Sequence, residues 1–407
     1  MSQIRLGATA AALCVVAFAV HAQPPALAPL PEGETLGPYV YAGSRYDSNP
    51  FRVSGDDEAE ERLDTGDFDD LIHRAGAGVR MNWPISLQTL RLDAWLERNR
   101  YQRFDELDHT AGDAELAWDW EIGRRFGGTI ETGYARELTR FEENQSVERD
   151  IKTTRRYSAD GGYRFLPDWE VRAGVAEQRQ GHDRRETLDR HERSRFAELA
   201  YESPTGSRVG LRAERTDADL ESTREGGDGA VIDNDYAQDD YSVVLGWAVT
   251  AQSRLTGRAG YTRREFDEAR GRDFSGTTAR LTYDWQPTVK LGLRLSGWRE
   301  LQARDDDAVS YVLARGVGLE PTWQATPDVT LRGSLAWQRS EFQADDEAGV
   351  GNAGRDDTTR TVGVGVDYRA LRNLRVSLGI EREVRNSNRA VSDYDYEQVS
   401  AGVSYAF

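Results

Sequence analysis

Cysteine is almost absent from this chain of 407 residues. The one cysteine, Cys14, lies in an apolar run over residues 8–20 that follows the positive charge of Arg5. Val20-His21-Ala22 supplies small residues at the usual cleavage positions, so we expect residues 1–22 to be a secretory signal peptide. Cleavage after Ala22 leaves a mature chain without cysteine, which excludes disulfides and thiol chemistry.

Long apolar runs are also missing. Beyond residue 22 no run is long enough to cross a bilayer as a helix. Mean hydropathy is -0.70, and 30% of the residues are charged. These values exclude a helical membrane protein. The formal net charge of -18 argues against a nucleic-acid partner. No blade repeat of about 40–50 residues is present, which argues against a propeller.

Catalytic signatures are weak. The chain has neither a G-x-S-x-G nor an H-E-x-x-H motif. His182 and His191 flank a predicted loop beside Asp183 and Asp189, so a hydrolase with a histidine base has to be considered. We favour the interpretation that these are solvated loop histidines. The sequence therefore predicts no enzyme, no catalytic residue, no metal site and no cofactor.

Alternating side chains are what the chain has in abundance. In its last residues Val399, Ala401, Val403, Tyr405 and Phe407 fall on one face of a strand, and small polar residues fall on the other. Such a strand of about ten residues is long enough to span a bilayer. An aromatic carboxy-terminus is typical of the closing strand of an outer-membrane barrel.

The same alternation recurs in about eighteen segments, an even number within the range of bacterial barrels. Short connections carry proline, whereas long ones are rich in acid, glycine and asparagine, which is the alternation of periplasmic turns and extracellular loops. We therefore predict an all-β, antiparallel, up-and-down transmembrane barrel over residues 36–407, after a proline-rich periplasmic leader at 23–35. The predicted location is the cell outer membrane. The expected partners are its lipid and lipopolysaccharide and the barrel-assembly machinery, which would recognise Phe407.

Aromatic residues beside the short turns fit a girdle at one membrane interface. They are Trp83, Phe165, Trp247, Trp285, Trp323 and Tyr368.

Strand parity sends a set of arginines into the lumen. The candidate pore-lining residues are Arg80, Arg91, Arg156, Arg164, Arg172, Arg212, Arg258, Arg280, Arg294, Arg332 and Arg375. The same parity sends carboxylates inward, among them Glu131, Glu198 and Glu214. One interpretation is a set of ion-pair ladders between neighbouring strands. The other is a lining that guides an anionic or polar chain, because the arginine fork suits carboxylates and polar polymers.

An acidic segment, Ser54–Asp70, holds nine aspartates and glutamates. We favour a solvated loop over a divalent-cation site, because the spacing lacks the glycine and ligand order of an EF-hand.

A short motif follows the first predicted strand: Tyr46, Asp47, Asn49, Phe51 and Arg52 stand in the order Y-D-x-N-x-F-R. It resembles the opening of EpsL-type outer-membrane proteins of exopolysaccharide biosynthesis, which are associated with exosortase systems. Position 50 departs from that pattern, since a proline replaces an aliphatic residue. The overall plan also resembles the alginate export porin.

The resemblance implies a channel that exports an exopolysaccharide chain together with periplasmic partners. The alternatives are a diffusion porin for small anions or oligosaccharides and a structural or adhesin barrel. Strand periodicity by itself indicates the architecture and leaves these functions open.

Overall fold

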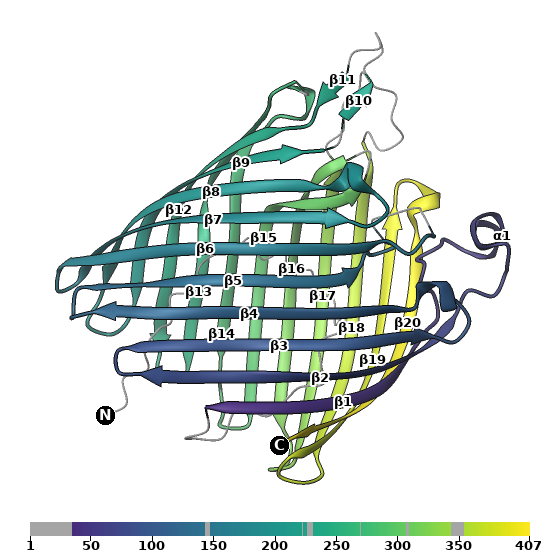
Figure 1. The fold of residues 1–407 in the computed structure, drawn as a ribbon, viewed down its shortest axis with the longest axis horizontal. Coiled ribbons are helices and arrows are strands. Elements are labelled where there is room, and N and C mark those ends of the chain that lie inside the picture. Colours follow the sequence, from purple (N-terminus) through teal and green to yellow (C-terminus); the bar gives the residue numbers. More distant parts are fainter. Residues whose placement is uncertain are drawn as a thin grey trace.

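Eighteen antiparallel strands form one closed ring in the computed structural model of the chain (Figure 1). The structure describes residues 35–142, 147–221, 223–225, 231–268, 270–306, 309–342 and 354–407. The predicted signal peptide (1–22) and nearly all of the predicted leader (23–35) lie outside the described residues. The strand β1 pairs with β2 on one side and with β20 on the other, which closes the barrel. The predicted fold class, with about eighteen strands, is confirmed.

The barrel strands run in chain order around the ring. They are β1 (Leu36–Asp47), β2 (Asp70–Ile85), β3 (Gln88–Tyr101), β4 (His109–Ile122), β5 (Phe126–Leu138), β6 (Ile151–Leu166), β7 (Trp169–His182), β8 (Arg190–Glu202), β9 (Arg208–Leu220), β12 (Tyr236–Thr250), β13 (Ser253–Phe266), β14 (Phe274–Trp285), β15 (Leu291–Asp306), β16 (Val309–Gln324), β17 (Val329–Phe342), β18 (Asp356–Arg369), β19 (Leu374–Ser387) and β20 (Tyr394–Ala406).

Smaller elements lie in the connections. A hairpin of β10 (Thr223–Glu225) and β11 (Val231–Asp233) stands between β9 and β12. The connection from β1 to β2 contains the helix α1 (Asp56–Leu63). The described residues also form the 3-10 turns η1 (Asp105–Leu107), η2 (Glu186–Leu188), η3 (Arg270–Arg272) and η5 (Ala390–Ser392). No helix in the described ranges is long and apolar enough to cross a bilayer.

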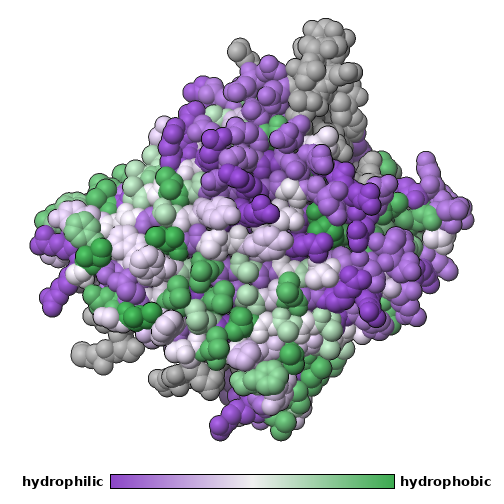
Figure 2. All heavy atoms as spheres, in the orientation of Figure 1, coloured by the Kyte–Doolittle hydropathy of each residue, from purple (hydrophilic) through white to green (hydrophobic). Residues whose placement is uncertain are grey.

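The outer face of the barrel is apolar. Leu211 is 64% exposed, Val364 61% and Tyr241 61%, and each lies on the opposite face of its strand from the lumen. All six residues of the predicted aromatic girdle are exposed as well. Apolar residues gather over the strands in Figure 2, whereas hydrophilic residues crowd the end that carries α1 and the long loops. An apolar outer face of this kind is suited to contact with lipid. The strands can cross a bilayer because a closed barrel satisfies the hydrogen bonds of all its backbone groups.

The acidic segment Ser54–Asp70 differs from the solvated loop that we predicted. Its middle forms α1, and Ala59 in that helix is completely buried. Leu63 and Phe68 pack against a cluster at the mouth of the barrel. Most of the acids occupy the solvent side of this segment, while apolar residues spaced between them fold back onto the barrel. Asp70 is the exception, because its carboxylate is buried and accepts hydrogen bonds from the N–H groups of Gln102, Arg103 and Phe104.

Candidate functional site

The lumen face is fixed by strand register. In β1, Tyr39 and Tyr41 are buried inside the barrel, whereas Val40 between them is 42% exposed to the outside. Successive side chains alternate between faces, so the cross-strand pairs carry this parity around the ring. All eleven candidate arginines fall on the lumen face by this register.

Eight of these arginines form ion pairs with carboxylates. The pairs are Arg91–Asp119, Arg164–Glu202, Arg172–Asp160, Arg212–Glu214, Arg258–Glu214, Arg280–Glu300, Arg294–Asp284 and Arg332–Asp367. Most of the partners lie on a neighbouring strand or on the same strand. This is the ladder arrangement, and it neutralises much of the positive charge that the sequence placed in the lumen.

The ladder is densest on β6 to β9. Arg208 lies 2.7 Å from Glu198, and Arg212 lies 3.1 Å from Glu214 and 3.8 Å from Glu198. The Arg212 side chain is only 8% exposed, and its guanidinium carbon sits 3.6 Å from the centre of the Phe196 ring. These groups hold one another in fixed positions on the wall.

Three further candidate arginines lie on the same lumen face. The Arg156 Nε donates a hydrogen bond of 3.2 Å to the Gln178 side chain, and Arg156 is exposed to the lumen. The Arg80 guanidinium lies 5.8 Å from the centre of the Tyr39 ring. Arg375 lies opposite Arg369 and Ser404 near the short-turn end.

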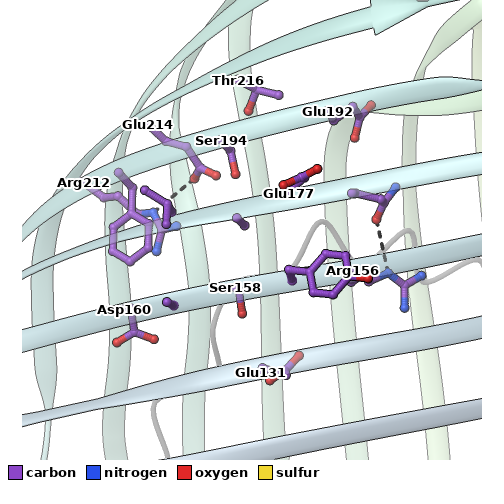
Figure 3. A pocket seen from close by; sticks show the side chains of 16 residues that line it. Glu131, Arg156, Ser158, Asp160, Glu177, Glu192, Ser194, Arg212, Glu214 and Thr216 are labelled. Carbon is purple, nitrogen blue, oxygen red and sulfur yellow. Dashed lines mark hydrogen bonds and ion pairs between the residues drawn. The ribbon is translucent and has the colours of Figure 1, made fainter.

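A hollow interrupts the lumen wall between β5 and β9 (Figure 3). It opens onto the lumen and is lined by residues of β5, β6, β7, β8 and β9. Ser158, Ser194 and Thr216 lie along its floor, and Glu131, Arg156 and Arg212 border it. Sequence reasoning placed Glu131, Arg156 and Arg212 in the lumen but missed the hollow. A hollow depends on which small residues lie opposite one another, and this requires the register of four strand pairs.

The motif residues form a buried turn at the extracellular mouth. The Asn49 side chain accepts a hydrogen bond from the Val53 N–H at 3.0 Å and donates to the Val53 and Asp395 carbonyls at 2.8 and 3.0 Å. Arg52 pairs with Asp47 at 3.0 Å and lies 3.6 Å from the centre of the Tyr396 ring. Burial alone would lower the pKa of Arg52, but Asp47, with Tyr396 nearby, raises that pKa above its usual range.

This turn places Phe51 at the centre of an apolar cluster. The Phe51 ring is 1% exposed and meets Phe104 at 4.7 Å and Phe141 at 4.8 Å between ring centres. Pro50 occupies the second position of the turn closed by the Arg52 N–H and the Asn49 carbonyl, a position that favours proline. The proline at position 50, which departs from the EpsL-type pattern, therefore suits the turn. Tyr46, the first motif residue, points outward and is 39% exposed.

One connection reaches across the mouth. The backbone carbonyl of Glu142, after β5, accepts hydrogen bonds from Arg304 on β15 at 3.4 Å and from Arg385 on β19 at 3.0 Å. The strands β5 and β15 stand on opposite sides of the ring. The segment therefore narrows the extracellular end of the lumen.

His182 differs from the solvated loop histidine that we predicted, because its side chain lies inside a hydrogen-bond network. The Nδ1 of His182 lies 2.8 Å from Asp150, and its Nε2 lies 3.0 Å from the Gln180 amide. Both ring nitrogens are thereby engaged, and His182 is buried. Burial alone would raise the pKa of Asp150, but hydrogen bonds from His182 and Thr139 hold it well below its usual range. The network fixes the start of β6, and no group of metal-binding side chains occurs among the described residues.

Comparisons with known proteins find a family model and solved structures that are similar to this chain. Residues 230–407 match the family described as "Putative beta-barrel porin 2". The chain is porin-like and lies in the outer membrane. Among solved structures, the outer membrane protein OpdK of Pseudomonas aeruginosa is 10% identical with a TM-score of 0.48, covering 92% of this chain and 98% of that one.

Two further structures from the same organism are similar. OccK2 (OpdF) in complex with glucuronate is 11% identical with a TM-score of 0.48, over 91% of this chain and 98% of that one. A mutant of the ferric enterobactin receptor PfeA is 9% identical with a TM-score of 0.46, over 92% and 81%. No curated protein matches the sequence.

Proposed function

We propose that the barrel is a passive diffusion channel for small hydrophilic solutes. The observation that carries this proposal is the lumen wall, where charged residues face inward and most arginines are already paired with carboxylates. A wall of this kind is wetted by water and carries little net charge of one sign along the ladders. Lumen side chains tune selectivity in such barrels, so we expect weak discrimination by charge and stronger discrimination by size.

The mouth supports size selection. Phe51, Phe104 and Phe141 pack together at the extracellular end, and the Glu142 carbonyl links two opposite walls. A narrowed mouth suits small solutes better than a continuous polymer.

Planar-bilayer recording tests the proposal. The refolded barrel should give ohmic channels, and the reversal potential in a salt gradient should indicate little preference for anions over cations. In liposome-swelling assays small sugars should enter faster than larger ones. A folded barrel that conducts no ions would contradict the proposal and favour a structural or adhesin role.

A second candidate is export of an exopolysaccharide, and one observation favours it. The motif Tyr46, Asp47, Asn49, Phe51 and Arg52 resembles EpsL-type proteins, and four of these five residues are buried at the mouth, where an exported chain would leave. Export through this barrel requires the mouth to open, with periplasmic partners delivering the polysaccharide. Loss of surface polysaccharide in a deletion strain, restored by the wild-type gene, would favour export over diffusion.

Assembly partners are part of the same proposal. Phe407 is 69% exposed and its N–H donates a hydrogen bond to the Pro38 carbonyl at 3.0 Å. We propose that this aromatic end is what the barrel-assembly machinery recognises, and that the apolar belt contacts outer-membrane lipid and lipopolysaccharide. Deleting Phe407 should lower the amount of folded barrel in the membrane.

A further inference from the structure

A row of small side chains forms the floor of the lumen hollow. Ser158, Ala176, Ser194 and Thr216 pair directly with one another across β6, β7, β8 and β9. Neighbouring strands lie about 4.8 Å apart, so the row extends roughly 14 Å around the wall. Small residues at four successive positions leave a groove where longer side chains would fill the space. Figure 3 shows Ser158 and Ser194 between the larger bordering groups.

One border of the groove is rigid. The Phe196 ring lies against Gly174, where an added Cβ would come within 2.5 Å of a ring atom. Arg212 stacks on the ring at 3.6 Å, and Asp160 beside it is paired with Arg172. Because each of these groups is held by another, this border is preorganised, and a ligand would meet it without inducing a rearrangement.

The other border offers polar groups that remain available. Arg156 is exposed to the lumen and donates one hydrogen bond, to Gln178. Glu131 pairs by register with Ser158. Within the described part of the chain, the Glu131 carboxylate accepts no hydrogen bond and lies in no ion pair, although the charges of Arg91 and Arg156 act on it. Guanidinium donors, a carboxylate acceptor and the hydroxyls of Ser158, Ser194 and Thr216 therefore face one space.

This chemistry suits a neutral polyol better than an anion. Hydroxyl groups are both donors and acceptors, so they can satisfy Arg156 and Glu131 together. An anion could pair with Arg156 but would also face Glu131. Glu192 and Glu214 line the same hollow and already have partners, Tyr236 for Glu192 and two arginines for Glu214. Carboxylates outnumber guanidiniums among the residues that line the hollow, so the additional negative charge of an anionic ligand is disfavoured.

We propose that the hollow is a binding subsite for a neutral, polyhydroxylated solute, such as a short oligosaccharide, on the inner wall of the channel. This inference rests on the proposed diffusion function, which it makes more specific. The groove runs around the wall, across the strands, so a bound sugar would lie against one side of the lumen and leave the opposite side to water.

Direct binding tests the subsite separately from conduction. Saturation-transfer NMR with raffinose on the detergent-refolded barrel should give a saturable signal, and gluconate at the same concentration should give less. Ser194→Trp fills the floor and should abolish the raffinose signal. Ser334→Trp is the matched control, because Ser334 is a small lumen-facing residue on the opposite wall, paired with Gly363. The control should bind raffinose like the wild type.

A second variant tests the subsite in case Ser194→Trp does not fold. Glu131→Gln removes one charge-assisted hydrogen bond and should weaken raffinose binding about tenfold. Equal raffinose binding by wild type, Ser194→Trp and Glu131→Gln would overturn the subsite, as would stronger binding of gluconate than of raffinose. Bilayer conductance tests the channel function separately. A barrel that conducts ions but does not bind raffinose would contradict the subsite and would still agree with the diffusion function.

Discussion

Replacing Arg212 by glutamine tests whether the lumen ladders stabilise the barrel. Arg212 is 8% exposed, and its partners Glu198 and Glu214 are 5% and 7% exposed. Removing one partner of a buried ion pair costs about 3–5 kcal/mol in proteins. Here Glu198 keeps Arg208 and Glu214 keeps Arg258, so we expect roughly half of that, about 2 kcal/mol.

The matched control is Arg294→Gln. Arg294 pairs with Asp284 at 2.8 Å, but the two side chains are 55% and 41% exposed to the lumen. Exposed pairs contribute about 0–1 kcal/mol, so this variant should be nearly as stable as the wild type. Both variants keep a polar side chain on the lumen face and remove one positive charge.

Reversible urea unfolding in detergent or lipid vesicles measures the difference, with tryptophan fluorescence and heat-modifiable gel migration as signals. A double-mutant cycle with Glu214→Gln should return a coupling free energy of about 0.5–3 kcal/mol for the Arg212–Glu214 pair. Equal destabilisation by Arg212→Gln and Arg294→Gln, or zero coupling, would refute the reasoning that burial decides the strength of these ladders.

Three further predictions follow from other parts of the barrel. Leu335→Arg places a charge on the lipid face of β17 and should cost roughly 2–4 kcal/mol in urea unfolding, whereas Ser334→Arg on the lumen face should cost much less; the reverse order would invert the assigned faces. Asp150→Asn should expose the start of β6 to limited proteolysis at neutral pH. In the wild type this protection should be complete above about pH 4 and lost in stronger acid, because a depressed carboxyl pKa stabilises only while the group is ionised. Arg385→Gln removes a donor to the Glu142 carbonyl and should raise single-channel conductance; unchanged conductance would mean that this segment does not narrow the mouth.

Strand parity could be predicted from sequence because it depends on residues two apart. Val399, Val403 and Phe407 define an outward face without any knowledge of the neighbouring strands. The same parity placed Arg172 and Arg212 on the lumen face. Their pairing partners could not be predicted, because which carboxylate lies beside each arginine depends on the register between strands.

The mouth was the least predictable part. The segment Ser54–Asp70 looked like a solvated loop because its acids dominate the composition. Its fold depends instead on Ala59, Leu63 and Phe68, which are too few and too irregularly spaced to stand out. The motif residues Asn49 and Arg52 stood out by resemblance, but their contacts with Asp395 and Tyr396 join the first and last hairpins of the barrel. Contacts over such sequence separations have no local signal.

Charge pairing and the hollow together explain how this lumen could select solutes. A wide barrel has no apolar core, so its inward side chains must satisfy one another or water. On β6 to β9 the ladders of Arg172, Arg208 and Arg212 do this and leave little unpaired positive charge. Selectivity would then depend on the places where pairing is incomplete. The hollow bordered by Arg156 and Glu131 is one of these places. Its floor is the row of small side chains, which leaves room for a solute to bind.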